Sequence, residues 1–260
     1  MNQELLDKIA AYKAKGFEVP DEDMIKTPEQ IAGIREACKI NTAVLDEVAK
    51  HIKAGMTTAE IDKIVYDFTV AQGATPAPLG FCGFPKSVCT SINDQVCHGI
   101  PSEHDVLKSG DIVNVDVSTI YNGYYADASR MFMIGEVSDE AKKLVEVTKE
   151  SVDLALQEVK PWGRLGNIGA VISEHVHKHG YTVLRDIGGH GVGNDFHEDP
   201  YVCHVGKRDT GMLLVPGMVF TIEPMVNEGE EDFFVDEEND WTVYTEDDGL
   251  SAQIEYMVLV

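Results

Sequence analysis

The chain has 260 residues with 45 acidic and 21 basic side chains, which gives a formal net charge of −24. Such a charge makes nucleic acid a poor partner, because phosphate binding requires clustered Lys and Arg. Hydrophobic residues make up 43% and charged residues 25% of the sequence, the balance of a globular protein with a packed core.

No apolar run approaches the roughly 20 residues that a membrane-spanning helix needs. The first 20 residues contain only the short apolar doublet Leu5-Leu6, so a secretory signal is not expected either. Five cysteines form no CxxC pair and no even framework, which indicates reduced thiols in a cytoplasmic protein.

Helix signals follow one another along the chain. Residues 1–23 predict a short helical appendage with an acidic linker at its end, and residues 24–260 form the main domain. Capping boxes at Thr27 to Gln30 and at Thr57 to Glu60 each open a helix, and Gly55 and Gly73 end these two helices. Two more helices are predicted over 139–159 and 167–179.

Between the helices lie stretches whose composition favours β-structure. They are residues 87–97, 111–134, 181–187, 218–227 and 250–260. Antiparallel sheet covered by helices on one side is the simplest arrangement of these elements, so the sequence predicts an α+β fold.

The segment DIVNVDVSTIYNGYYADASRMF (111–132) predicts a β-hairpin, because Asn122-Gly123 suits a type I′ turn. If Tyr121 faces Tyr124, then Asp116 and Asp127 become diagonal neighbours on one face, about 7 to 8 Å apart at the backbone. Two short carboxylates at that spacing can converge on a cation. The alternative is a pair of exposed aspartates on a surface hairpin.

Two histidines occur in GGHGVGNDFHEDP, where glycines allow close approach of the backbone. His190 and His197 are separated by irregular chain that can turn both imidazoles into one cleft, although either one alone could be a structural residue. The trio His175, His177 and His179 ends a predicted helix, where histidines compensate the helix dipole.

Two glutamates lie in apolar runs that predict strands: Glu223 in MVFTIEPMV and Glu255 in QIEYMVLV. Charged residues in such runs are rarely buried unless they are paired or bind a metal, and the alternative is an outward-facing edge position. Together with Asp116, Asp127 and His190 they form an oxygen-rich set that suits Mn, Fe(II), Co or a similar divalent ion.

The charge is concentrated near the end of the chain: residues 209–260 contain 14 acidic residues and neither Lys nor Arg. Much of it lies in Glu228 to Asp240, which shows no helical or strand period and predicts a solvated loop. An alternative is that some of these carboxylates strengthen the field at a cation site.

From about residue 24 to the end, the sequence resembles the type I methionine aminopeptidases. The resemblance depends on five blocks in the right order: FPKSVCTSINDQVCHGIP (84–101), the hairpin segment, GGHGVGNDFHEDP, PGMVFTIEPM (216–225) and SAQIEY (251–256). It implies the pseudo-two-fold "pita-bread" fold, with residues 24–260 as a catalytic metallopeptidase domain.

The resemblance also implies an activity, which is removal of the initiator methionine when the second residue is small. Water activated by two divalent metal ions would attack the first peptide bond, and Asp127 and Glu255 would bridge the two ions. The implied metal ligands are Asp116, Asp127, His190, Glu223 and Glu255. Glu223 also suits a general base, and His98 and His197 would contact substrate and the tetrahedral intermediate.

The implied methionine pocket consists of Phe81, Phe84, Cys89, Phe196 and Trp241, whose aromatic and sulfur contacts suit a thioether. Phe81 and Phe84 lack the hydroxyl that tyrosine gives some relatives, and Tyr256 follows the bridging glutamate where a His or another polar residue is more usual. The appendage and the long acidic segment also depart from compact members of the family.

Two other readings compete with this one. Proline-directed aminopeptidases and dipeptidases share the order of ligands, but the 84–101 block favours a methionine aminopeptidase. A catalytically dead member that only binds partners should have lost ligands, and none is missing. We expect a cytoplasmic monomer that acts on peptide or nascent-chain N-termini, with transient ribosome association and no membrane contact.

Overall fold

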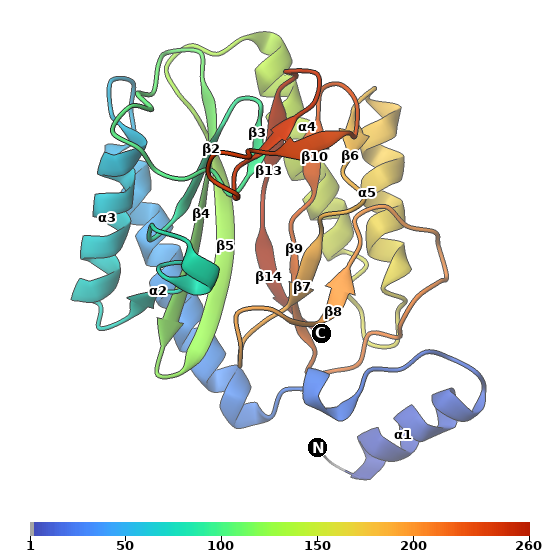
Figure 1. Cartoon of the computed structure of the whole chain (residues 1–260). Coiled ribbons are helices and arrows are strands. Elements are labelled where there is room, and N and C mark those ends of the chain that lie inside the picture. The colour runs from blue at the N-terminus through green and yellow to red at the C-terminus, as the bar shows by residue number, and fades with distance from the viewer. Residues whose placement is uncertain (1–2) are drawn as a thin grey trace.

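Two helix pairs flank the strands of the protein in a computed structural model that describes residues 3–260 (Figure 1). Helices α2 (Pro28–His51) and α3 (Thr58–Ala71) lie beside the long strands β4 (Ile112–Tyr121) and β5 (Tyr124–Met133). Helices α4 (Asp139–Leu156) and α5 (Gly166–Lys178) pack together on the other side. The predicted α+β class is therefore correct.

Within residues 3–260, the strand pairs are all antiparallel and form four small sheets. Two sheets have four strands: β1, β4 and β2 with β5 paired to β4, and β14-β9-β7-β8; two have three, β13-β10-β6 and β11-β12-β3. The remaining strands are β1 (Thr75–Pro76), β2 (Cys89–Ile92), β3 (Gln95–Cys97), β6 (Thr182–Val183), β7 (Gly189–Gly191), β8 (Glu198–Val202), β9 (Val219–Ile222), β10 (Met225–Asn227), β11 (Phe233–Val235), β12 (Val243–Thr245), β13 (Ser251–Gln253) and β14 (Tyr256–Leu259).

Helix starts follow the predicted caps. The hydroxyl of Thr27 accepts a hydrogen bond from Gln30 N at 3.2 Å, and the Gln30 side chain accepts one from Thr27 N at 2.7 Å. Thr57 and Glu60 form the same reciprocal pair at the start of α3. Each box satisfies backbone N–H groups that a helix start otherwise leaves unpaired.

The hairpin of β4 and β5 has the predicted register. Asn122 and Gly123 both have positive φ, 51° and 82°, as a type I′ turn requires. Tyr121 pairs with Tyr124, which places Ser118 opposite Asp127 and Asp116 opposite Ser129. The two aspartates therefore share one face of the hairpin.

Three strand predictions need correction. Glu223 and Glu255 do not lie within strands: Glu223 falls in the break between β9 and β10, and Glu255 in the break between β13 and β14. The region around His190, expected to be irregular, contains β7 and β8. The acidic segment 228–240 contains β11, which pairs with β12, so it is not wholly a loop.

At the break that contains Glu255, a backbone bridge joins β5 of the hairpin to the segment between β13 and β14. Ser129 of β5 donates its N–H to Glu255 O at 3.3 Å, and the two residues form an isolated antiparallel bridge. This bridge places Glu255 beside the face of the hairpin that carries both aspartates.

Each helix pair covers its own hydrophobic core. Val44, Leu45, Ile61 and Val65 pack on the hairpin side, and a larger cluster that includes Leu144, Ile168, Ile172 and Phe220 lies under α4 and α5. In the described part of the chain, no helix is long and apolar enough to cross a membrane.

The N-terminal appendage packs on the same chain. Helix α1 (Gln3–Ala14) places the ring of Tyr12 in a stack on Trp162, with ring centroids 5.2 Å apart, and Lys8 Nζ lies 4.1 Å from the centroid of the Trp162 ring. The following 3-10 turn, η1 (Glu22–Met24), leads into α2. Leu5 and Ile9 of α1 are partly buried against the larger hydrophobic core, although α1 has no fully buried residue.

Deleting residues 1–20 is expected to leave the fold and the catalytic rate intact while lowering stability by about 1–3 kcal/mol, since an aromatic stack and a cation–π contact are lost. The measurements are thermal unfolding and kcat of the truncated protein beside the full chain. A truncated protein that fails to fold would show that the appendage is part of the core, and would contradict a domain that begins at residue 24.

Candidate active site

One cavity of about 300 Å³ brings together all twelve residues that the sequence singled out. They come from segments between residues 81 and 255, so folding gathers them from across the chain. The cavity is lined by Phe81, Phe84, Cys89, His98, Asp116, Asp127, His190, Phe196, His197, Glu223, Trp241 and Glu255, together with other residues.

The two hairpin aspartates lie on the wall of this cavity. Asp127 is 5% exposed, and its Oδ1 accepts a hydrogen bond from Ser118 Oγ at 2.8 Å. Asp116 Oδ1 is buried and has no hydrogen-bond partner. The alternative of two exposed aspartates on a surface hairpin is therefore wrong.

The two glutamates face the aspartates from the opposite sheet segments. Glu223 is 7% exposed and Glu255 is 2% exposed, so the edge-strand alternative is wrong for both. Glu223 Oε1 accepts a hydrogen bond from Thr221 Oγ1 at 2.5 Å, and Oε2 accepts one from Gln253 Nε2 at 3.2 Å. These two donors fix the plane of the Glu223 carboxylate.

His190 completes the cluster from β7. Its Nδ1 donates to the carbonyl of Gly191 at 2.9 Å, which leaves Nε2 free to act as a ligand. Nε2 lies 3.7 Å from Asp127 Oδ2 and 3.6 Å from Glu223 Oε1. Potential ligand atoms of Asp127, His190 and Glu255 all lie within 4.8 Å of one another.

Glycine at position 191 permits this placement, because a Cβ there would collide with the carbonyl of Asp199 on β8. A larger residue would push β7, which carries His190, away from β8. The close approach that the glycine-rich sequence indicated is thus present.

The four acidic side chains of the cluster are hard to ionise, because they are buried close to one another. Burial raises the pKa of Asp116 to about 6 and that of Glu223 to about 8. Burial, and then the neighbouring carboxylates, raise the pKa of Asp127 and of Glu255 well above their ordinary values. Asp116 keeps some exposed surface because it borders the cavity, yet the surrounding protein still raises its pKa.

The donor set fits a divalent cation. Four carboxylates and one imidazole match the preference of Mn, Fe(II) or Co rather than that of a thiolate zinc site. A bound cation would give the unpartnered Asp116 Oδ1 a partner, and it would offset the cost of burying several negative charges together.

Two further histidines lie beside the cluster. The ring of His197 lies 4.3 Å from that of His190, and the ring of His98 lies 6.3 Å from that of Trp241, measured between centroids. Burial, and then neighbouring imidazoles, lower the pKa of both His98 and His197. Both rings are therefore neutral near pH 7 and can each donate one N–H.

Aromatic rings enclose the other end of the cavity. Phe81 contacts Phe196 edge-on with centroids 4.9 Å apart, and Phe84 contacts Trp241 edge-on at 5.1 Å. Cys89 is buried beside Asp116, and burial raises the pKa of its thiol well above the ordinary value. The thiol is thus protonated and behaves as an apolar group.

A buried ion pair holds the loop that carries His197. Lys26, 4% exposed, pairs with Glu198 Oε2. Glu198 Oε1 accepts hydrogen bonds from the N–H groups of Asn194 and Asp195 at 2.7 and 2.8 Å. The chain on both sides of His197 is therefore fixed.

With this geometry in place, comparisons with known proteins give its family. The sequence profile of "Metallopeptidase family M24" matches residues 32–260. The chain belongs to this family.

Several relatives are close in sequence. Methionine aminopeptidase A of Synechocystis is 47% identical over 231 residues, which is 89% of this chain and 91% of that protein. Methionine aminopeptidase of Escherichia coli K12 is 46% identical over 237 residues, 91% of this chain and 89% of that protein.

Solved structures agree with the sequence comparison. The crystal structure of methionine aminopeptidase from Rickettsia prowazekii superimposes with a TM-score of 0.89 at 42% identity, covering 91% of this chain and 95% of that one. The pita-bread fold is therefore confirmed. An X-Pro aminopeptidase from Thermotoga maritima, at 24% identity and a TM-score of 0.71, shares the fold and covers 92% of this chain and 59% of that one.

The sequence did not point to the residues that orient the candidate metal ligands. The hydroxyl of Thr221 accepts a hydrogen bond from the N–H of His190 at 2.9 Å and donates one to Glu223, so it aligns two candidate ligands. His204, buried and with its pKa lowered by burial to about 3, accepts the N–H of Glu223 at 3.1 Å. For Thr221 and Gln253 a signal existed, because each lies two residues before a candidate glutamate.

Proposed function

We propose that this M24 peptidase removes the N-terminal methionine from peptides and nascent chains whose second residue is small. The observation that carries the proposal is the cavity itself. Its aromatic end, formed by Phe81, Phe84, Phe196 and Trp241, has a size and polarisability that suit one methionine side chain, and it opens directly onto the carboxylate cluster.

Two divalent ions are proposed to bind at Asp116, Asp127, His190, Glu223 and Glu255, with Asp127 and Glu255 shared between them. The central placement of these two carboxylates, each among the other acidic groups, supports this division. Bound divalent cations supply Lewis acidity and lower the pKa of water in the site toward neutrality.

Glu223 is proposed as the general base. Thr221 and Gln253 each hold one of its oxygens, so the carboxylate keeps one orientation as it accepts a proton from the attacking water. Burial raises the pKa of Glu223 to about 8, and a bound divalent cation would oppose this shift and favour the ionised carboxylate that a base requires. The proton can then pass to the amine that leaves.

His197 and His98 are proposed to stabilise charge on the reacting peptide bond. Each neutral ring offers an N–H at the border between the ligand cluster and the aromatic end of the cavity. A preorganised donor costs no reorganisation when the carbonyl oxygen becomes negative. The buried Lys26–Glu198 pair supports this role by fixing the loop of His197.

The test of the proposed function is release of methionine from a Met-Ala-Ser peptide by the purified protein. Chelation should stop the release, and Mn²⁺, Fe²⁺ or Co²⁺ should restore it. An N-formylated peptide should be refused, because its amino group can no longer face the carboxylate cluster as a free amine. Cleavage of X-Pro peptides alone would assign the protein to the proline-directed branch of this fold.

His197→Ala is expected to lower kcat by about 10² or more with the metal content unchanged, since the lost donor acts on developing charge. The matched control is His177→Ala, which removes an exposed imidazole of α5 and should leave kcat as it is. Metal analysis of both proteins accompanies the kinetics. Loss of metal from the His197 variant would make His197 a ligand and overturn the division of roles.

The cellular setting is also proposed rather than measured. A peptidase acting on initiator methionine meets its substrate as nascent chains emerge, which supports a cytoplasmic location and transient association with the ribosome. The strongly acidic surface argues against a specific nucleic-acid contact in that association. Gel filtration would test the expected monomer.

A further inference from the structure

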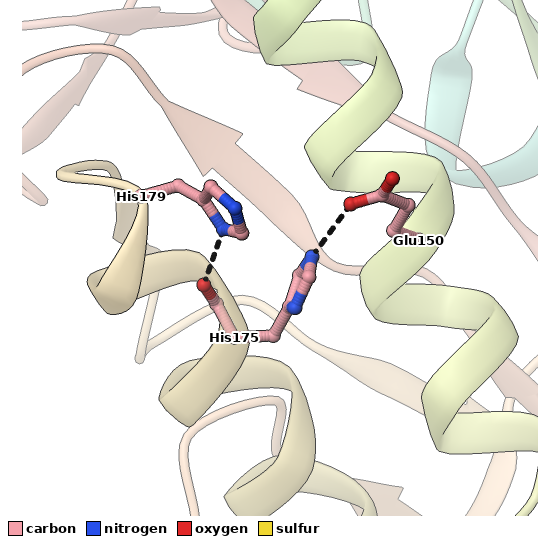
Figure 2. A group of neighbouring side chains, drawn as sticks. All are labelled: Glu150, His175 and His179. Atoms are coloured by element: carbon pink, nitrogen blue, oxygen red, sulfur yellow. Dashed lines mark hydrogen bonds and ion pairs between the residues drawn. The ribbon is translucent and has the colours of Figure 1, made fainter.

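A second cluster of metal-ligating side chains lies where α4 and α5 pack together (Figure 2). It consists of Glu150 on α4, His175 on α5 and His179 at the end of α5. Potential ligand atoms of the three residues all lie within 4.8 Å of one another. None of the three lines the catalytic cavity formed by the described residues.

The two histidines are placed as a chelating pair. They are four positions apart, so both rings lie on one face of the helix, and their centroids are 4.6 Å apart. His179 Nδ1 donates to the carbonyl of His175 at 2.9 Å, which directs the lone pair of a neutral ring to Nε2. His190 in the catalytic cavity has the same arrangement with Gly191 O.

Glu150 supplies an oxygen from the neighbouring helix. Its Oε2 lies 3.0 Å from His175 Nε2, and its side chain is 53% exposed. Ligand atoms around a tetrahedral zinc ion are about 3.3 Å apart, given metal–ligand bonds of about 2.0–2.2 Å. Modest rotation of these surface side chains would therefore bring all three onto one ion, which would replace the hydrogen bond between Glu150 and His175.

The chemistry of the cluster selects the class of ion. Two imidazole nitrogens and one carboxylate oxygen suit zinc and similar transition metals, whereas magnesium and calcium require mainly oxygen ligands. The net charge of −24 also raises the local concentration of cations at the surface.

We propose that Glu150, His175 and His179 form a second, external site for a divalent transition metal, represented by Zn²⁺, that ties α4 to α5. The sequence predicted only compensation of the helix dipole by the three histidines of this segment. Dipole compensation would involve His177 as well. In the structure, however, His177 is exposed and is not part of the cluster. The proposal does not depend on the peptidase activity.

Two measurable consequences follow. Metal analysis of the full chain should find one more zinc ion than the catalytic cavity holds. Zinc at the external site should also stabilise the protein, since an ion that binds the folded state alone shifts the unfolding equilibrium. The stabilisation should act where α4 and α5 cover the larger hydrophobic core.

The experiment is equilibrium dialysis of metal-free protein against buffered micromolar free Zn²⁺, followed by zinc analysis. It compares the wild-type chain with His179→Ala, Glu150→Gln and the matched control His177→Ala. Circular dichroism and thermal unfolding without zinc establish that each variant is folded. A second series of thermal scans with Zn²⁺ measures the stabilisation.

Wild type and His177→Ala are expected to bind one zinc ion more than His179→Ala, and Glu150→Gln should bind that ion at least about tenfold more weakly. The zinc-dependent rise in Tm should be smaller in His179→Ala than in the control. Equal stoichiometry in all four proteins would overturn the proposal, and so would an equal loss in His177→Ala, which would indicate nonspecific binding by surface histidines.

Discussion

Asp127→Ala should abolish peptidase activity, with a fall in kcat of at least about 10³, while Asp116→Asn should lower it by only about 10–10². Asp127 lies in the centre of the cluster: one oxygen takes the Ser118 hydroxyl, and the other lies 3.7 Å from His190 Nε2. A carboxylate that is proposed to serve two ions cannot be replaced by a methyl group. The amide in Asp116→Asn still offers one oxygen at the margin of the site.

Metal stoichiometry and turnover of both variants test this difference. Asp46→Ala is the matched control, because it removes a surface carboxylate whose partner is the half-exposed Arg130. We expect the control to match wild type in both measurements. A near-normal rate for Asp127→Ala would refute the proposed role of the hairpin carboxylates.

The hairpin shows how far sequence reasoning reaches when one local signal fixes a register. Asn122-Gly123 admits one common turn geometry, and the two-residue period of a strand then determines every pair as far as Asp116 opposite Ser129. No contact from elsewhere in the chain is needed for this inference. The same locality explains why both capping boxes were correctly placed.

The positions of residues that depend on long-range contacts could not be predicted from local sequence signals. Glu255 is set by its bridge to Ser129, and Lys26 reaches Glu198 across 172 positions. No local sequence pattern indicates either of these contacts. The break at Glu223 is also not predictable, because it interrupts an apolar run that favours a continuous strand. The candidate ligands were identified together by the resemblance to methionine aminopeptidases, because five sequence blocks retain their order. The residue patterns alone left the alternative of exposed or structural side chains open.

For the acidic segment 228–240, the composition gave a prediction that the structure corrects. A charged run predicts a solvated loop, yet Phe233–Val235 forms β11 against β12. Asn239 Oδ1 then accepts the N–H of Trp241 at 2.9 Å. Among the residues that the structure describes, no acidic side chain of 228–240 lines the cavity. The segment thus supports a pocket wall, and the alternative of a cation-facing role finds no geometric support.

Peptides that begin Met-Ala or Met-Gly should be cleaved far faster than Met-Leu or Met-Arg peptides, by about 10² or more in kcat/KM. At about 300 Å³ the cavity is at the lower end of the range for ligand pockets, about 300–1,000 Å³. In the proposed orientation methionine fills the aromatic end of the cavity, and the second residue lies between the carboxylate cluster and His98. We expect a large side chain there to collide with protein atoms, whereas a methyl group or hydrogen should not.

The measurement is kcat/KM for a peptide series that differs only at the second residue, with the metal held constant. Because the clash raises the barrier without removing the methionine contacts, the poor substrates should still compete with Met-Ala for the cavity, and more metal should not rescue their cleavage. Norleucine in place of the first methionine preserves the shape of the side chain but removes the sulfur. Comparing its kcat/KM with that of methionine therefore separates the effect of side-chain size from that of the thioether contact. Equal cleavage of Met-Ala and Met-Arg peptides would show that the second residue lies outside the cavity, and the proposed substrate orientation would then be wrong.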